Sequence, residues 1–274
     1  MPESKQDRLR RMALETIEGK RKQGFFLPYR YADGVKAPGS YPAIEAVFDR
    51  HRDQFQSVLD EIDARASVLE AFAGPPPKPR WDQDWFPRAD GAAAYAMVAS
   101  RRPRKVIEVG SGHSTRFMAA AASSGAGITC IDPEPRADFG DLAVDWRRSV
   151  LSEAHLPMFE ALEPGDFAFF DSSHLMMPGT DVDMIFNRIL PALRRGVIVH
   201  IHDILLPDPY PDVWEWRGYN EQNGLGGWIL AGGLKPLFSS RYAVTRMGAA
   251  EAGVLSRLPL NSGAVETSFW AEKS

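Results

Sequence analysis

The order of apolar and polar positions divides most of the chain into short strands separated by amphipathic helices. Strands are predicted at 105–109, 127–131, within 143–151, at 167–170 and at 197–202, and helices at 114–123, at 181–194 and from about 221. The runs at 167–170 and 197–202 are almost continuously apolar, which is typical of strands covered on both faces. Because strands alternate with helices, the pattern predicts an α/β fold with a doubly wound, mostly parallel sheet.

The first third of the chain follows a different pattern. Residues 1–24 mix basic and acidic side chains closely, which favours a solvated, helical extension, or else a contact with an oligomer partner or a polyanion. Between 43 and 72 the apolar residues recur at helical spacing, up to a proline break at 75–77. We therefore predict an N-terminal helical extension over 1–88, serving as a lid or an oligomer contact, and a main domain over 89–274.

An aromatic and acidic stretch joins these two parts. It contains Trp81, Trp85 and Phe86 within six residues, with aspartates at 82, 84 and 90 interleaved. Two interpretations remain open for it. The rings either line the mouth of a pocket or anchor the extension to the core, and a short helix at 92–100 then leads into the first strand.

A glycine turn follows the first predicted strand. The sequence KVIEVGSGHST passes from an apolar strand into Gly110-Ser111-Gly112 and then into a helix. Glycines there permit positive φ and let a ligand lie close to the backbone, while the first N–H groups of the helix face that ligand. Glu108 comes two residues before the turn, so the site suits a ligand with positive charge or donor groups better than a pyrophosphate.

A second acid stands at the end of the next predicted strand. The segment GITCIDPEPR places Asp132, and then Glu134, about twenty residues after the turn. In nucleoside-binding α/β folds an acid at this spacing accepts hydrogen bonds from the ribose hydroxyls.

The pair EVGSGHST and CIDPEP resembles the cofactor half of class I S-adenosylmethionine-dependent methyltransferases, in particular a bacterial small-molecule subgroup. That family has an acid, then G-x-G-x-G, and a ribose-binding acid after the second strand; here Ser114 replaces the third glycine. The resemblance covers roughly 89–274 and implies a seven-stranded sheet that is closed by an antiparallel pair, for which the apolar runs at 234–240 and 265–272 are candidates. It implies S-adenosyl-L-methionine as cofactor, with the methionine part near Glu108 and the ribose on Asp132. The predicted cofactor-binding residues are Glu108, Gly110, Ser111, Gly112, His113, Asp132 and Asp171.

Histidines and acids gather where the predicted strands end. Four of the six histidines, at 113, 174, 200 and 202, lie at or near the carboxyl ends of strands, where ligands bind in open parallel sheets. His200 and His202 share one face of their strand, and the deeper His200 is more typical of a core residue. We predict His174, His202 and Asp203 as the catalytic residues.

The same cluster raises the prospect of a divalent metal. Asp171 and Asp203, at adjacent strand ends, offer oxygen ligands for Mg²⁺ or Mn²⁺, and addition of His202 or His174 would suit Fe, Zn or Mn. The resemblance points the same way, because metal-dependent O-methyltransferases of the superfamily place acidic ligands at these strand ends. The competing interpretation is metal-free, with His174 or His202 as general base.

Composition narrows the choice of partners. The net charge is −4, so we expect no nucleic acid as the main partner. No apolar run reaches the roughly 18 residues of a membrane span, and the charged N-terminus does not resemble a secretory signal. The lone cysteine, Cys130, forms no internal disulfide. Together these features favour a cytoplasmic protein that acts on a small molecule, and they leave a homo-oligomer open.

Four functions fit the sequence to different degrees. The first is a methyltransferase that acts on oxygen, with possible walls of the acceptor pocket at Tyr210, Trp214, Trp216, Tyr219 and Glu221. The second, a nicotinamide-dependent oxidoreductase, is disfavoured because G-x-G-x-x-G fails at Thr115 and Glu108 would face phosphates. The third is a metal-dependent hydroxylase or hydrolase that uses the His/Asp cluster, and the fourth is a binding module without catalysis.

Overall fold

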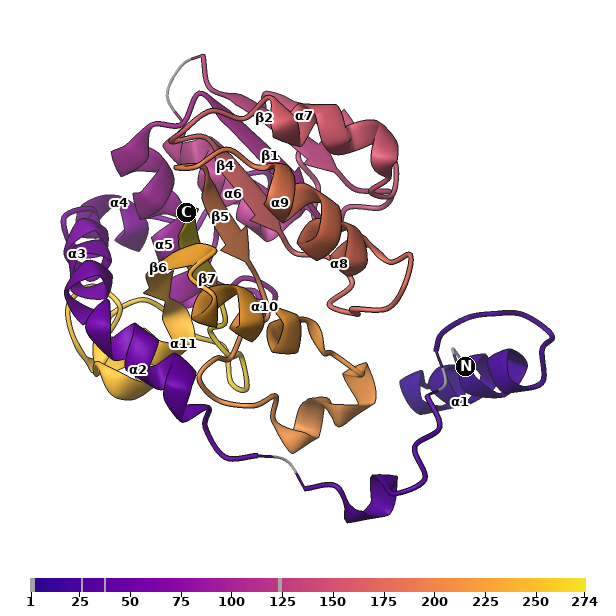
Figure 1. Cartoon of the computed structure of the whole chain (residues 1–274). Helices are drawn as coiled ribbons and strands as arrows, with labels where there is room; N and C mark the ends of the chain where they lie inside the picture. The colour runs from indigo at the N-terminus through magenta and orange to yellow at the C-terminus, as the bar shows by residue number, and fades with distance from the viewer. Residues whose placement is uncertain (1–2, 26, 37, 123–124) are drawn as a thin grey trace. The chain divides into compact units, whose positions relative to one another are not determined.

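The computed structural model describes residues 3–25, 27–36, 38–122 and 125–274, which divide into two compact units at residues 38 and 39. The first unit contains α1 (Lys5–Ile17) and a 3-10 turn, η1 (Ala32–Gly34). Ser4 begins α1, because its hydroxyl accepts a hydrogen bond from the backbone N–H of Asp7. The helix predicted in this charged segment is therefore present (Figure 1).

The second unit is built on one seven-stranded sheet. Its strands are β1 (Lys105–Val109), β2 (Gly127–Ile131), β3 (Val144–Arg147), β4 (Phe167–Phe170), β5 (Ile198–Ile201), β6 (Leu234–Ser239) and β7 (Phe269–Lys273). The strand order is β3-β2-β1-β4-β5-β7-β6, in which β7 pairs antiparallel with β5 and β6 and all other pairs are parallel. The predicted mostly parallel sheet with an antiparallel closing pair is confirmed.

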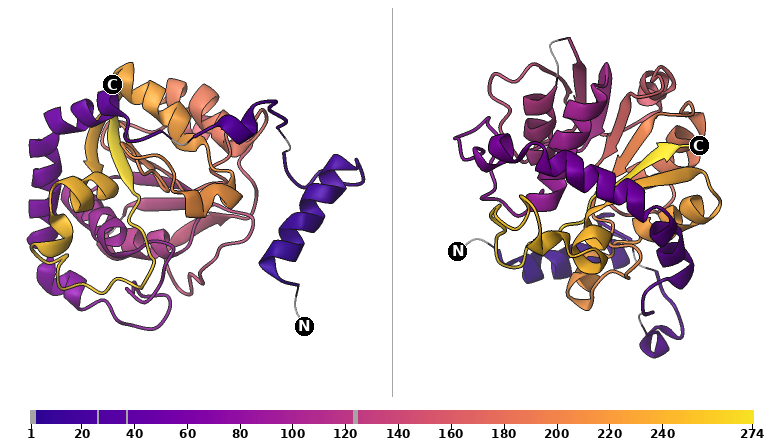
Figure 2. Two further views of the ribbon diagram at one scale, coloured as in Figure 1. Left: turned by 90° about the horizontal axis from the view of Figure 1, so that it is seen from below. Right: turned by 90° about the vertical axis from the view of Figure 1, so that its left-hand side faces the viewer.

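Helices cover both faces of this sheet. They are α2 (Pro42–Arg50), α3 (Arg52–Asp63), α4 (Ala66–Glu70), α5 (Arg88–Arg101), α6 (His113–Ala121), α7 (Leu156–Glu160), α8 (Asp181–Met184), α9 (Leu190–Ala192), α10 (Glu221–Leu230) and α11 (Ser240–Arg246). Helices α3, α5 and α6 lie on one face, and α7 to α10 lie on the other (Figure 2). The buried strands β4 and β5 run between these two layers.

Three predicted helical segments differ from the observed ones. The stretch predicted as one helix over 43–72 is three helices, which break at His51 and again near Arg65. The segment 181–194 contains a π-helical turn at Ile185–Ile189 between α8 and α9. The helix predicted at 114–123 ends at Ala121 as α6, and residue 123 lies outside the described residues.

The boundary between the units also differs from the predicted one at residue 88. Helices α2 and α3 belong to the sheet unit, because their apolar faces are part of its core. Phe48 stacks on Phe269 of β7 with 5.8 Å between ring centroids, and Phe55 packs edge-on against Phe238 of β6. Aromatic contacts of this kind hold α2 and α3 against the antiparallel edge of the sheet.

Candidate active site

The glycine turn after β1 is fixed by the strand beside it. Gly110 has φ +74°, and a Cβ atom there would lie 1.7 Å from the backbone oxygen of Asp171. The N–H of Gly110 donates to the carbonyl of Ile131, and the N–H of Asp171 donates to the carbonyl of Val109. Only glycine fits here, since the ends of β1 and β4 approach so closely.

Glu108 lies below this turn. It is completely buried, and its carboxylate accepts hydrogen bonds from the hydroxyls of Ser114 at 2.5 Å and Thr115 at 2.6 Å. Burial, opposed by these hydrogen bonds, raises the pKa of Glu108 to about 7. Glu108 therefore ties β1 to the start of α6, and its predicted contact with the methionine part of a cofactor stays a prediction. Ser114, which occupies the place of the third glycine, supplies one of these hydrogen bonds.

Asp132 braces the turn from the end of β2. One carboxylate oxygen accepts from the N–H of Ser111 at 2.6 Å and from its hydroxyl at 3.1 Å, and the other accepts from the N–H of Glu134 at 2.7 Å. The sequence correctly placed Asp132 next to residues 110–112. Oδ1 accepts one of these hydrogen bonds and keeps a further lone pair for a ligand, whereas Oδ2 already accepts two.

A narrow crevice lies over the turn. It is lined by Trp85, Phe86, Ser111 to Ser114, Arg136 and Asp171, and its volume is about 20 Å³. His113 is buried there, with its ring parallel to that of Trp85 at 5.8 Å, and its Nδ1 has no hydrogen-bond partner within the described part of the chain. Burial and the charges of Arg116 and Arg80 lower the pKa of His113 to about 4. His113 is therefore a neutral ring that carries an unused polar atom.

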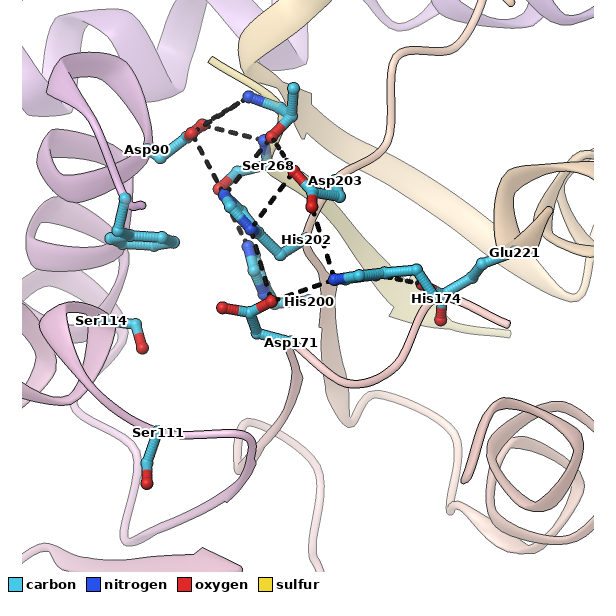
Figure 3. A network of polar contacts seen from close by, with 12 residues as sticks. Asp90, Ser111, Ser114, Asp171, His174, His200, His202, Asp203, Glu221 and Ser268 are labelled. Carbon is cyan, nitrogen blue, oxygen red and sulfur yellow. Dashed lines mark hydrogen bonds and ion pairs between the residues drawn. The ribbon is translucent and has the colours of Figure 1, made fainter. Parts of the chain in front are cut away.

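The His/Asp cluster lies where β4 and β5 end (Figure 3). His174 Nε2 is 3.2 Å from Asp171 Oδ1 and 3.4 Å from Asp203 Oδ2. Its other ring nitrogen, Nδ1, is 2.8 Å from Glu221 Oε2 at the start of α10. The sequence predicted that the residues at 171, 174 and 203 would meet, and they do.

His202 approaches the same two aspartates from the opposite side (Figure 3). Its Nδ1 lies 3.6 Å from Asp171 Oδ1 and 3.8 Å from Asp203 Oδ1, which is too long for a hydrogen bond. Its Nε2 lies 3.3 Å from both Asp90 Oδ2 and the hydroxyl of Thr267. The Nε2 side thus contacts α5 and the C-terminal segment, whereas Nδ1 faces Asp171 and Asp203 at ion-pair distance and has no partner within hydrogen-bond distance in the described part of the chain.

The carboxylates and imidazoles of this cluster stabilise one another in their charged forms. Burial alone would lower the pKa of both imidazoles, but the facing carboxylates hold the pKa of His174 and of His202 well above the ordinary value. Burial would likewise raise the pKa of Asp171, yet the facing imidazoles hold it well below its usual range. The backbone is strained at the same place, since His174 has φ +60° and Asp203 has φ +52°.

His200 differs from the other histidines of the cluster. It is completely buried, stacks on Phe169 at 3.7 Å and places Nε2 2.9 Å from the hydroxyl of Ser268. Burial, together with the neighbouring His202, holds the pKa of His200 well below its usual value. The sequence favoured a core role for His200, and these contacts are those of a core residue.

Two carboxylates behind the histidines were not predicted as partners of the rings. Asp90 was placed at a possible pocket mouth, but it is completely buried in the first turn of α5 and accepts the N–H groups of Thr267 and Ser268. Glu221 was placed in the wall of an acceptor pocket, but it is buried against His174. A lone acid opening an apolar helix is the only signal in the sequence that marks either residue.

A larger cavity opens beside the cluster, with a volume of about 280 Å³. Its lining residues are Asp84, Trp85, Arg136, Asp171, His202, Asp203, Trp214, Arg217 and the segment 262–265. Asp171 also lines the crevice over the glycine turn, so the two spaces adjoin at one carboxylate. Trp214 lines this cavity, with Arg217 over its ring at 4.3 Å, and its role toward an acceptor stays a prediction.

The C-terminal segment that completes this cavity is anchored through α5. Glu266 forms a buried, two-point ion pair with Arg88, at 2.7 Å and 3.1 Å. Its carboxylate also accepts the N–H of Ala89. Residues at the N-terminus of α5 therefore position both the cavity wall and, through Asp90, the imidazole of His202.

The predicted metal ligands Asp171, His202 and Asp203 are close together, but they face one another as ion pairs. Within the described residues, no group of three or more His, Cys, Asp or Glu side chains is arranged to hold a metal ion. The metal therefore stays a prediction. In the same part of the chain, no helix is both long and apolar enough to cross a membrane.

Part of the chain, including the glycine turn, matches a known protein family. Residues 107–204 match a family described as a methyltransferase domain, which spans β1 to the end of β5 and therefore both the glycine turn and the His/Asp cluster. A search of curated protein sequences gave no match.

Solved structures with a similar fold include two bacterial O-methyltransferases. One, from Bacillus cereus in complex with SAH, is 17% identical, with 80% of this chain and 91% of that chain covered and a TM-score of 0.45. The other, TomG from Streptomyces achromogenes in complex with SAM, is 15% identical, with 89% and 94% covered and a TM-score of 0.43. The MycE methyltransferase of the mycinamycin pathway, in complex with Mg, SAH and mycinamycin VI, is 17% identical over 65% of this chain and 47% of that chain, with a TM-score of 0.36. At these identities and scores the similarities identify neither an acceptor nor a catalytic residue.

Proposed function

We propose that this chain, a class I S-adenosylmethionine-dependent methyltransferase by its matched domain and the architecture of its sheet, methylates an oxygen atom of a small hydroxylated molecule. The observation that carries the proposal is the position of His202. Its Nδ1 faces Asp171 and Asp203 at 3.6 Å and 3.8 Å, beyond hydrogen-bond distance, and the residue lines a cavity that adjoins the crevice of the glycine turn at Asp171. A donor and an acceptor bound in these two spaces would meet beside an imidazole.

The residues around the crevice fit the cofactor. Ser111 and Gly112 of the turn line the crevice, and the buried Nδ1 of His113 offers an unused polar atom there. Asp132 stands where it could accept from ribose hydroxyls. When bound, S-adenosylmethionine would supply a methyl group on a positively charged sulfur. The carboxylate of Asp171, which has a low pKa and lines the crevice, would favour such a cation nearby.

The catalytic task of this chain is then to remove a proton. Transfer of a methyl group to a hydroxyl releases one proton from that hydroxyl, and a general base must take it. His202 can do so at Nδ1, because Asp90 and Thr267 hold its Nε2 side. An Nε2–H that is held by a buried carboxylate leaves Nδ1 as the acceptor, as in the catalytic triads of hydrolases. The carboxylate of Asp203 lies close to both imidazoles, so its negative charge offsets the positive charge that His202 gains with the proton.

The nature of the cavity supports a small, polar acceptor. About 280 Å³ is at the lower end of the volumes of small-molecule sites, and charged side chains at 136, 171, 203 and 217 line it together with two tryptophans. Such a lining offers hydrogen bonds to hydroxyl groups and flat surfaces to a ring.

Two measurements test this function. Calorimetry with S-adenosylhomocysteine should show binding that Asp132→Ala weakens at least about tenfold, since the variant loses the ribose partner and one brace of the turn. Glu134→Ala, which changes an exposed acid two residues away, should bind like wild type. Release of S-adenosylhomocysteine from S-adenosylmethionine is then assayed with phenols, sugars and hydroxy acids. Absence of binding in the wild type would refute the cofactor assignment.

A divalent metal at the cluster is the second candidate, and one observation favours it. Each of the two inward-facing imidazoles has its far nitrogen next to a buried carboxylate, Glu221 for His174 and Asp90 for His202. Carboxylates in this position commonly orient metal-bound histidines. Elemental analysis of the purified protein, with activity measured before and after chelation, distinguishes a metal-assisted mechanism from the metal-free one. Stoichiometric metal with chelator-sensitive activity would replace the imidazole base by a metal-assisted one.

A further inference from the structure

The aromatic stretch before α5 has two buried rings and one exposed ring. Trp81 and Phe86 are buried in the core, and the indole N–H of Trp81 donates to the carbonyl of Leu69. Trp85, between them, is 54% exposed and has a parallel contact with the ring of His113. Each interpretation thus describes part of this stretch: Trp81 and Phe86 are buried anchors, and Trp85, with Phe86, lines the crevice.

The position of Trp85 determines how much room the crevice has. Trp85 lines the crevice over the glycine turn as well as the larger cavity. With its ring on His113, which is only 6% exposed, the crevice has a volume of about 20 Å³. Sites for ligands of nucleoside size usually measure about 300 Å³ or more. The crevice by itself is therefore far too small for a nucleoside while Trp85 keeps this position.

We propose that Trp85 is a movable cover of the cofactor crevice, which must leave the ring of His113 before the cofactor can bind at the glycine turn. This inference rests on the proposed function, because it takes the crevice to be the cofactor site. Trp85 can move without loss of core packing, since more than half of its side chain is exposed and its neighbours Trp81 and Phe86 hold the backbone.

A cover of this kind competes with the cofactor. The Trp85–His113 contact must break before the crevice opens. The apparent affinity for the cofactor is therefore the affinity of the open form multiplied by the fraction of molecules that are open. Removal of the indole should therefore tighten binding and speed association. Aromatic pairs of this kind imply an effect of roughly two- to tenfold.

The cover can be tested before any ligand is added. Diethyl pyrocarbonate acylates neutral imidazoles, and His113 is neutral at pH 7, so mass spectrometry of the modified peptide reports how accessible this ring is. Trp85→Ala should raise the rate of modification at His113 at least about threefold, in the range that loss of an aromatic contact implies. Trp228→Phe, a change in α10 beside Gly233 that touches neither cavity, should leave that rate unchanged.

The second measurement is binding of S-adenosylhomocysteine to the same variants by calorimetry and stopped flow. Trp85→Ala should bind roughly two- to tenfold more tightly and associate faster than wild type, with Trp85→Phe in between. Unfolding temperatures of the three variants show that the fold is retained.

The possible outcomes separate the two proposals. An unchanged modification rate in Trp85→Ala overturns the cover, whatever the cofactor does. Weaker or unchanged S-adenosylhomocysteine binding in that variant also overturns it, because Trp85 would then be a contact of the cofactor or unrelated to it. Faster modification with no binding to any form of the protein refutes the cofactor assignment, and with it the role of Trp85 towards a cofactor.

Discussion

At the scale of single residues, His202 combines burial, an Nδ1 that faces the carboxylates of Asp171 and Asp203 beyond hydrogen-bond distance, and a position at the cavity wall. We expect His202→Ala to lower kcat by about 10²- to 10⁴-fold, the usual contribution of a general base. Affinity for S-adenosylhomocysteine should change less than threefold, because His202 does not line the crevice. The matched control is His155→Ala, a half-buried histidine next to Ser152, with a wild-type rate expected. A wild-type kcat in His202→Ala would remove this residue from the mechanism.

Asp90 helps to set the pKa and the tautomer of the His202 imidazole. The groups that face this imidazole are Asp90, Asp171, Asp203 and Thr267, and the carboxylates raise its pKa above the ordinary 6.5. A base must be unprotonated, so kcat should fall as the pH drops through a value above 6.5.

Asp90→Asn should move this acidic limb to lower pH, since one carboxylate that raises the pKa is lost. It should also lower the maximal kcat by about 10²-fold or more, because an amide N–H facing Nε2 favours the tautomer with its proton on Nδ1. Rate profiles from pH 5 to 10 for both proteins test this, with the unfolding temperature as a check of the fold. A limb that stays in place would show that another group titrates.

At the scale of elements, the approach of β4 to the turn after β1 makes Gly110 a structural requirement. Gly110→Ala would bring a Cβ to 1.7 Å from the carbonyl of Asp171 at φ +74°, so we expect a loss of more than about 3 kcal/mol in the free energy of unfolding. Gly165→Ala, at φ +88° with open space around it, isolates the backbone strain and should cost about 1 kcal/mol. Urea titration measures both. Equal losses of unfolding free energy in Gly110→Ala and Gly165→Ala would contradict the close approach of Asp171 to Gly110. If Gly110→Ala loses this much stability, weak cofactor binding in that variant would reflect misfolding.

The elements that the sequence predicted best are those whose burial is uniform. Strands β1, β2 and β4 have the predicted bounds, and β4 shows why most clearly, because its four residues are all apolar and buried. The stretch at 43–72 kept a helical period through two breaks that neither proline nor glycine marks. The π-helical turn at Ile185–Ile189 likewise has no residue that signals it.

The sequence predicted those site residues that directly follow a strand, because the ends of the strands could be located. Residues 110, 132, 171 and 203 follow strands whose carboxyl ends lie at one edge of the sheet, so their proximity follows from the topology alone. The partners of the imidazoles come from α5 and α10, and which helix face meets which strand end depends on packing across the whole unit. Asp90 and His202 are 112 residues apart, a separation that no local pattern encodes.

At the scale of the whole molecule, the core of the sheet unit includes no described residue before Gly39. The buried hydrophobic cluster begins at Ile44 and includes side chains from α2 and α3 through β7, whereas the described apolar residues of α1 that face solvent, Leu9, Leu14 and Ile17, contribute nothing to it. Hydrophobic burial is the main source of stability. Deletion of residues 1–38 should therefore leave the folded state of 39–274 intact.

We expect the shortened chain to unfold within about 3 °C of the full chain and with the same cooperativity, since that shift corresponds to less than about 1 kcal/mol for a domain of this size. The control is a deletion of residues 1–50, which also removes Phe48 and with it the ring stack on Phe269. That deletion should lower the unfolding temperature by about 6 °C or more, as loss of a buried phenylalanine costs about 3 kcal/mol. Calorimetry on the three proteins decides the matter. A large loss on removal of 1–38 alone would mean that the first unit stabilises the second.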